Sequence, residues 1–445
     1  MPDGTKRITP SRARSITIVT FLIAVLAFSM AISGSSRSLS PKDRVHVFEK
    51  VWKDVDLHYY DPEFGGVDWN AIHQRYLPQV KSAKDDRAFY TALDRMTAEL
   101  HDAHTRFSSP EQWKNHEKHM GLSVGFRAGY VEGKVVVLEV LPGSNAAIAG
   151  IEPGMVLTSV DGQPIAERLA ATTKRELPTS TERATKLRIL GEALAGPADS
   201  PFSASLTRAD GRTLNVKYDR QILSYAPKVT ARKLPSGFGY VRFDEFDPAL
   251  VKDFRVELKE LQSTPGLILD LRWNRGGVGA TLETMAGYFF NRRRLFERRM
   301  SRRQVAAAER DGDPAVEMEY FVGKKGGQIY SGPVVILLSE YSASATEVFA
   351  AGMQDSGRAT IVGGPSCGCV LGITHQRVMK GGGVLEISEI LWFSPRGRRL
   401  EGEGVVPNRL AFPTIEALLE KKDTALEAGE KTLQEIVVNQ GSTGQ

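Results

Sequence analysis

Cysteine is scarce in this sequence: its 445 residues include only Cys367 and Cys369, in the string Ser-Cys-Gly-Cys. No C-x-x-C pair or histidine cluster accompanies them, which argues against a zinc site. A relaxed disulfide is difficult over so short a loop, although a strained, reducible bridge stays open in an oxidising compartment. The G-x-G-x-x-G spacing of a dinucleotide-binding turn is also missing. We therefore expect neither a metal nor another cofactor.

Motifs of nucleic-acid-binding proteins are likewise absent, and the net charge of +5 is small for this length. Basic side chains gather in residues 291–303, where Phe296 is the only aromatic residue. A solvated helix end or a surface hairpin explains this stretch as well as a basic patch does. We expect no nucleic-acid partner. With 41% hydrophobic and 25% charged residues, the chain is typical of a globular protein with two or three folded units.

The N-terminus has the pattern of an export signal. Basic residues precede an uncharged, largely apolar run at residues 15–33, and small residues follow it. The run is about 20 residues long, which is also the length of a bilayer span, so residues 1–40 are read as a signal peptide or a membrane anchor. The basic side would stay in the cytoplasm. We expect the remainder to be periplasmic or extracellular, with possible anchorage at the inner membrane.

Hydrophobic periodicity divides the rest of the chain into three folded parts and a tail. Residues 41–117 carry apolar side chains at helical spacing and predict a helical bundle. Residues 118–225 alternate in short runs and predict a β-rich module, with a helical insertion near 166–198. Residues 226–425 alternate between strands and helices and predict an α/β domain with a mainly parallel sheet. Residues 426–445 are expected to be flexible, and the fold class is α+β multidomain.

Two strings in the α/β part combine groups that catalysis requires. Residues 342–347 (SASATE) follow the buried run 334–338 and open a helix. A serine at such a turn is exposed, and the N–H groups of the helix N-terminus can hold an oxyanion, although serine is also common as an ordinary helix cap. Residues 270–277 (DLRWNRGG) end another strand in a Gly-rich turn. There Gly276 can bring a backbone N–H close to a substrate carbonyl.

Together with three further strings, these two resemble the tail-specific, or C-terminal processing, serine proteases. The family pattern continues with Q-D-x-G-R-A, T-P-x-G-R and G-V-x-P-D segments, which stand here at 354–359, 394–398 and 404–408. The resemblance implies a crotonase-like catalytic domain with Ser344 as its nucleophile. It also implies that Gly276 and Ala345 supply the oxyanion N–H groups.

The resemblance further interprets the β-rich module as a PDZ domain. Such domains hold a C-terminal carboxylate on backbone N–H groups and add the peptide to a sheet edge. Residues 144–151 resemble the helix of the PDZ domain. The partners implied are protein or peptide substrates with free C-termini. The string that resembles the carboxylate-binding loop consists of Gly121, Leu122, Ser123 and Val124.

The sequence departs from this family at the general base. The family has a lysine twenty-five residues after the nucleophile, and that position is Cys369 here. A neutral thiol is a poor base, and a thiolate would compete as a nucleophile. Lys380 is an alternative candidate for the base, but it stands in the glycine-rich string KGGG, which is typical of a hairpin. Either activity is lost or another residue serves as the base.

A histidine base is available from the tricorn-like branch of the family. The string LHDAHT at residues 100–105 resembles the motif of that branch, whose catalytic histidine corresponds to His104. The glutamate of the branch corresponds to Glu401, which would orient His104 in a serine–histidine–carboxylate arrangement. His101 is the second candidate for the base, and Glu403 competes with Glu401. The serine that precedes the histidine in that branch is Ala103 here.

Two functions are consistent with these motifs. The first is an exported serine endopeptidase that uses Ser344, His104 and Glu401, with the PDZ module binding substrate C-termini. The second is a catalytically degenerate scaffold that binds a peptide or an apolar ligand. Oxidation of Cys367 and Cys369, which flank the expected catalytic turn, is a third idea and concerns regulation rather than function.

Overall fold

The computed structural model describes residues 38–196, 200–311, 318–323 and 330–442. The predicted export segment at residues 15–33 lies outside these ranges. Within them, no helix combines the length and the apolar character that crossing a bilayer demands.

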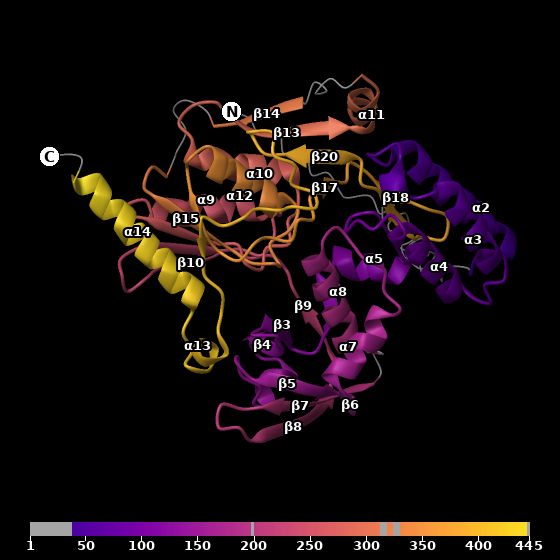
Figure 1. The fold of residues 1–445 in the computed structure, drawn as a ribbon, viewed down its shortest axis with the longest axis horizontal. Helices are drawn as coiled ribbons and strands as arrows, with labels where there is room; N and C mark the ends of the chain where they lie inside the picture. Colours follow the sequence, from indigo (N-terminus) through magenta and orange to yellow (C-terminus); the bar gives the residue numbers. More distant parts are fainter. Residues whose placement is uncertain (1–37, 197–199, 312–317, 324–329, 443–445) are drawn as a thin grey trace, which may run out of the picture.

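Three helices form the N-terminal layer (Figure 1). Each begins after a side chain that accepts a hydrogen bond from a first-turn N–H: Ser40, Asp68 and Asp85. Trp52 and Trp69 each donate an indole N–H to the other's backbone carbonyl, and this exchange holds the first two helices together. The helices are α2 (Pro41–His58), α3 (Trp69–Lys81) and α4 (Asp86–Ala98).

An antiparallel sheet follows, with a helical hairpin inserted between two of its strands. The sheet has the order β3-β4-β5-β7-β8, and β6 pairs with β5. The inserted helices are α7 (Ile165–Thr173) and α8 (Glu182–Leu194), and apolar residues of α8 join the core of the sheet. The short helix α6 (Asn145–Ile148) connects β4 to β5. The strands are β3 (Phe126–Val131), β4 (Lys134–Val140), β5 (Val156–Val160), β6 (Gln163–Pro164), β7 (Pro201–Thr207) and β8 (Thr213–Asp219).

A two-stranded ribbon joins this module to the rest of the molecule. Strand β2 (Met120–Ser123) enters the module and pairs antiparallel with β9 (Gln221–Ser224), which leaves it. Helix α5 (Pro110–Glu117) precedes the ribbon and carries a capping box between Ser109 and Gln112.

The largest layer is a six-stranded sheet with the order β10-β11-β12-β15-β16-β21. All neighbouring pairs are parallel except β10 with β11. Helices α9, α10 and α12 contribute to the core on one face, whereas α14 packs on the other. The strands are β10 (Thr230–Lys233), β11 (Gly239–Arg242), β12 (Leu267–Asp270), β15 (Val334–Leu338), β16 (Thr360–Gly363) and β21 (Arg409–Leu410). The helices are α9 (Leu250–Glu260), α10 (Gly279–Ala286), α12 (Ala345–Asp355), α13 (Ile415–Leu419) and α14 (Thr424–Ser442).

Two smaller sheets connect the large layer to the N-terminal helices. One has the order β14-β13-β20-β17, and the other the order β1-β19-β18. Leu385 and Leu391 of these sheets share one buried core with Val51 and Leu93 of the helices. The strands are β1 (Arg106–Ser108), β13 (Arg294–Ser301), β14 (Met318–Val322), β17 (Leu371–Gly372), β18 (Gln376–Val378), β19 (Val384–Glu386) and β20 (Ile390–Phe393); helix α11 (Arg302–Asp311) follows β13.

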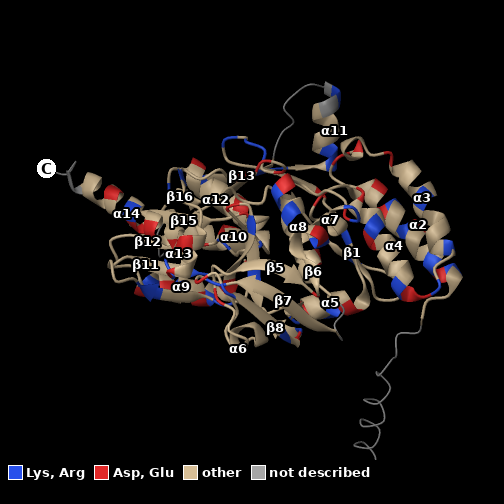
Figure 2. Ribbon diagram, turned by 60° about the horizontal axis from the view of Figure 1, so that its bottom comes forward, with Lys and Arg blue, Asp and Glu red and all other residues tan. Residues whose placement is uncertain are grey.

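The predicted mixed α/β fold is confirmed, but one expectation at the level of segments is wrong. Residues 426–445 were expected to be flexible, yet α14 extends to Ser442 because Leu433 is fully buried against the central sheet. The segment 41–117 contains helices, and its strand β1 pairs with β19 across the chain. The basic stretch 291–303 contains β13, with Phe296 buried inside. Figure 2 shows acidic and basic residues on each of the helices α2, α3 and α4.

Candidate active site

Ser344 stands at the turn between strand β15 and helix α12. Its backbone has φ 58° and ψ −124°, a conformation that costs a non-glycine residue energy and that occurs mainly at functional sites. Ser342, two residues earlier, is buried: its hydroxyl donates to the carbonyl of Leu271 and accepts from the N–H of Ser339. Both hydrogen-bonding roles of the Ser342 hydroxyl are thus used to support the turn.

His104 contacts the serine directly. Its Nε2 lies 3.1 Å from Ser344 Oγ, a hydrogen-bond distance between residues 240 positions apart in the chain. Asp102 shapes the loop, because its Oδ1 accepts from the N–H groups of His104 and Thr105. Burial lowers the pKa of His104 to about 4, against an opposing effect of Asp102. The imidazole is thus neutral at neutral pH and able to accept a proton.

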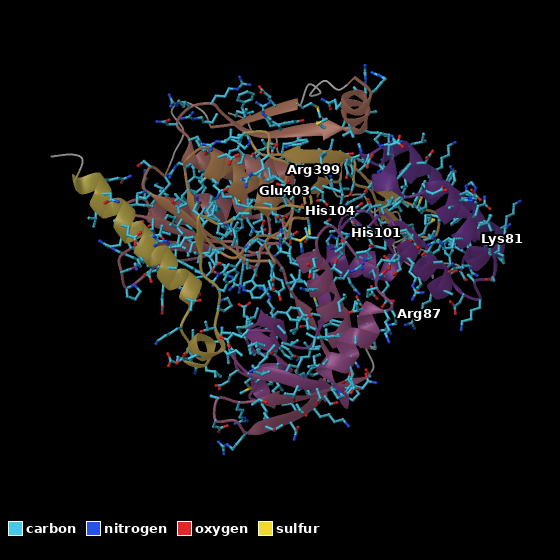
Figure 3. All side chains as sticks on the ribbon, in the orientation of Figure 1. Lys81, Arg87, His101, His104, Arg399 and Glu403 are labelled. Atoms are coloured by element: carbon cyan, nitrogen blue, oxygen red, sulfur yellow. A yellow bond between two sulfur atoms is a disulfide. The ribbon has the colours of Figure 1, made fainter. Side chains whose placement is uncertain are left out.

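The other basic candidates lie elsewhere. His101 was the second candidate for the base, but it follows the end of α4 at Ala98 and is exposed with φ 56°. Lys380 forms an ion pair with Asp43 in the N-terminal layer. Figure 3 labels both histidines, with His104 where the N-terminal layer meets the central layer.

Glu401 is buried close to the serine loop but makes no recorded hydrogen bond to His104. Its Oε2 accepts from the N–H of Val370, and interaction with the Ser180 hydroxyl lowers its pKa. Burial raises its pKa to about 7, with Asp102 and Glu347 adding to the effect. His104 Nδ1 is buried without a hydrogen-bond partner among the described residues. Glu403, the competing carboxylate, is exposed.

The cysteine pair forms the wall of the site next to Ser344. The carbonyl of Cys369 accepts from the N–H of Ser344 at 2.9 Å, so the twenty-five-residue spacing does bring this position to the nucleophile. Cys367 and Cys369 are joined in a disulfide. While it is bonded, neither sulfur is a thiolate that could act as a base or as a competing nucleophile.

Gly276 lies against the serine turn, as the oxyanion interpretation requires. A Cβ at Gly276 would stand 2.6 Å from Ser344 Cβ, so glycine is needed for this approach. Its N–H, however, donates to the side chain of Asn274 at 2.9 Å. The N–H of Ala345 lies in the first turn of α12, where no intrahelical acceptor exists. Asn274 also accepts from the Thr346 hydroxyl, which ties the two catalytic strings together.

Glu347 organises the loops of the site, a role that the sequence reasoning missed. Its fully buried carboxylate accepts from the N–H of Ser344, from the Ser366 hydroxyl and from the N–H groups of Gly368 and Cys369. Burial raises its pKa to about 7. Its place as the last residue of the SASATE string was the signal that could have revealed it.

The loop expected to bind a carboxylate lies at the start of the β-rich module. Gly121, Leu122 and Ser123 belong to β2, and the carbonyl of Val124 accepts from the Tyr218 hydroxyl. Gly125, which follows, packs against the N-terminus of α6, because a Cβ there would lie 2.8 Å from Ser144 Cβ. The loop and the helix resembling those of a PDZ domain are therefore neighbours.

Comparison with known proteins decides the family. Residues 237–410 match peptidase family S41, and residues 40–98 match the C1 domain of tricorn protease. Residues 237–410 therefore form a peptidase family S41 domain. It is 28% identical over 395 residues to a chloroplastic C-terminal processing peptidase of Tetradesmus obliquus, covering 83% of this chain and 77% of that protein. This S41 member is thus a serine-type peptidase.

Solved structures share the fold of this S41 chain. The photosystem II D1 C-terminal processing protease superposes with a TM-score of 0.55 at 24% identity, over 88% of this chain and 97% of the other. Mature CPAF complexed with lactacystin has a TM-score of 0.66 at 14% identity, over 90% and 99% of the two chains. At these identities the likeness concerns the fold alone.

Proposed function

We propose that this S41 peptidase cleaves protein or peptide substrates with Ser344 as the nucleophile and His104 as the general base. The observation that carries the proposal is the 3.1 Å contact between Ser344 Oγ and His104 Nε2. As Oγ bonds to the substrate carbonyl carbon, Nε2 takes the hydroxyl proton and later gives it to the leaving amine. Water then hydrolyses the acyl-enzyme by the same proton transfers.

The remaining residues of the site stabilise the charges that form on the substrate and on His104 during the reaction. The Ala345 N–H at the start of α12 is suited to hold the oxyanion, assisted by the helix dipole. Gly276 joins it as a donor if Asn274 releases its N–H. Glu401, when ionised, stabilises the imidazolium form of His104 through the enclosed site rather than by direct contact.

Substrate selection belongs to the β-rich module, which we propose to be a PDZ domain that binds substrate C-termini. Two observations support this: Gly125, which directly follows residues 121–124, packs against α6, and a relative that covers most of the chain is named a C-terminal processing peptidase. Ile148 of α6 is 80% exposed and is available for a peptide side chain. We also propose export through residues 15–33 on the strength of their sequence.

The alternative of a degenerate binding scaffold is not favoured. A scaffold under no selection for hydrolysis has no need to keep a serine in a strained backbone conformation within hydrogen-bond reach of a neutral histidine. Loss of the lysine is compensated by His104, which reaches the nucleophile from the N-terminal part of the chain.

The test compares the full chain with Ser344→Ala and His104→Ala on an unfolded protein and on two peptides that differ only in a free or an amidated C-terminus. Wild type should cleave, and both variants should lose cleavage by several orders of magnitude, because nucleophile and base act as a unit. The free C-terminus should lower KM if the module binds carboxylates.

Matched controls are available in the same loops. His101→Ala removes an exposed histidine three positions from the base, and Ser356→Ala removes a hydroxyl at the far end of α12. Both should cleave like wild type. Activity that survives His104→Ala but not His101→Ala would overturn the assignment of the base. An inert wild type that also fails to react with a fluorophosphonate serine probe would overturn the proposed function.

A further inference from the structure

The helical insertion of the β-rich module reaches into the active site at one short segment, residues 180–183, at the start of α8. Thr181 donates its hydroxyl to the carbonyl of Cys367 at 2.7 Å and also caps α8. The Arg183 guanidinium donates to the carbonyls of Ser366 and Glu403. This segment therefore holds both the loop beside the nucleophile and the turn that carries Glu401.

Apolar contacts reinforce the docking. Ala184 of α8 forms a small buried cluster with Cys367 and Cys369, and Ala103 and Ala343 pack against it. These residues come from α8, from the disulfide loop, and from positions directly preceding His104 and Ser344. The insertion is thus packed against the catalytic loops as well as hydrogen-bonded to them, which favours a fixed position.

Ser180 occupies the place where the histidine loop and Glu401 meet. Its Oγ accepts a hydrogen bond from the N–H of Ala103 at 3.1 Å, directly in front of His104. With that lone pair occupied, the hydroxyl proton is free to point to Glu401, whose pKa the Ser180 hydroxyl lowers. Glu401 itself makes no hydrogen bond to His104, so Ser180 connects this carboxylate to the histidine loop.

We propose that Ser180 is a positioning residue of the peptidase, whose hydroxyl bridges Glu401 to the backbone before His104 and so holds the base against Ser344. The proposal rests on the proposed function, since it assigns a role within the same site.

The bridge also acts on the ionisation of Glu401. Burial raises the pKa of Glu401, and the charges of Asp102 and Glu347 raise it further, whereas the Ser180 hydroxyl and the Val370 N–H lower it. Removing the hydroxyl should therefore raise this pKa and require a higher pH for the ionised form.

The experiment measures kcat, KM and the pH profile of peptide cleavage for the full chain and for Ser180→Ala, Ser180→Thr and Thr179→Ala. Ser180→Ala should lower kcat on the order of tenfold, the equivalent of one hydrogen bond, with KM unchanged. Its acid limb should move to higher pH. Ser180→Thr keeps the hydroxyl and should recover most of kcat.

Thr179→Ala is the matched control, because Thr179 contacts α8 through its backbone N–H rather than through its hydroxyl. It should behave like wild type. The inference alone is overturned if wild type cleaves and Ser180→Ala matches it, if Thr179→Ala is equally impaired, or if threonine does not restore kcat in a chain that melts like wild type. If wild type neither cleaves nor reacts with the fluorophosphonate probe, the proposed function fails and this inference fails with it.

Discussion

At the scale of residues, burial moves the base and the carboxylate of the site in opposite directions on the pH axis. Desolvation disfavours whichever form is charged, so it lowers the pKa of His104 to about 4 and raises that of Glu401 to about 7. Between these values His104 is already a neutral base, while Glu401 is still mostly protonated. The two groups therefore make separable predictions for the acid limb of activity.

We expect kcat/KM to fall as the pH drops through about 7, because the ionised form of Glu401, present above its raised pKa, is lost there. In Glu401→Gln this limb should disappear. The lower activity that remains should decline only near pH 4, where His104 becomes protonated. Profiles of kcat/KM from below pH 4 to mildly alkaline pH test this, with Glu403→Gln as an exposed control carboxylate.

Glu347 is a second buried carboxylate that affects the pH profile of kcat/KM, and the profile of Glu401→Gln distinguishes the two. Burial also raises the pKa of Glu347 to about 7, and this carboxylate holds the loop beside Ser344. A limb that stays near neutral pH in Glu401→Gln would assign it to Glu347 and remove Glu401 from the catalytic arrangement.

At the scale of elements, helices α12 and α14 show what local sequence and long-range packing each contribute to the site. Helix α12 begins at the reactive serine, and its first turn includes Glu347, which accepts hydrogen bonds from the disulfide loop. Helix α14 is tied at its start by Asp423, which pairs with Arg272 of the DLRWNRGG string. Packing of α14 therefore supports the strand end from which the Gly276 turn departs.

We expect Leu433→Ala to lower the free energy of unfolding by about 2–5 kcal/mol, the usual cost of a cavity left by a fully buried leucine. Gln434→Ala, an exposed neighbour on α14, should have little effect. Urea denaturation of the two variants measures the difference. Equal stabilities would mean that the C-terminal segment is flexible in solution, as its composition had suggested.

At the scale of the whole molecule, the N-terminal helices and the small sheets share one buried core. Their shared core includes Phe48 and Leu93 from the helices and Leu385, Ile387 and Leu391 from the small sheets. Strand β1, which follows the histidine loop, pairs with β19. The position of His104 relative to Ser344 is thus set by this interface.

We expect native-state hydrogen exchange to show α2–α4 and the strands β17, β19 and β20 opening together, at the same urea concentration. Neither side can bury its apolar face without the other. The antiparallel sheet β3-β4-β5-β7-β8 has its own core and serves as the internal comparison. Helices that open well before these strands would show that the N-terminal layer is an independent domain.

The sequence by itself determined the central α/β alternation and the resemblance to C-terminal processing proteases, and it proposed Ser344 as the nucleophile. Buried strand runs such as 334–338 and ordered motif strings depend on local patterns, which short-range physics imposes. Even the residue facing the nucleophile at the lysine position, Cys369, followed from spacing within one motif-bearing segment.

Only the tertiary structure decided the contacts among the remaining parts. His104 and Ser344 are separated by 240 positions, and the choice of His104 over His101 depends on a loop conformation stabilised by Asp102. Ser180 belongs to no recognisable motif. Its proposed role depends on docking of the insertion against the histidine loop, and the sequence of the insertion predicts only helices. The order of α14 depended on the apolar face of a sheet formed elsewhere in the chain. Contacts between distant segments are fixed by shape and burial, which no local pattern encodes.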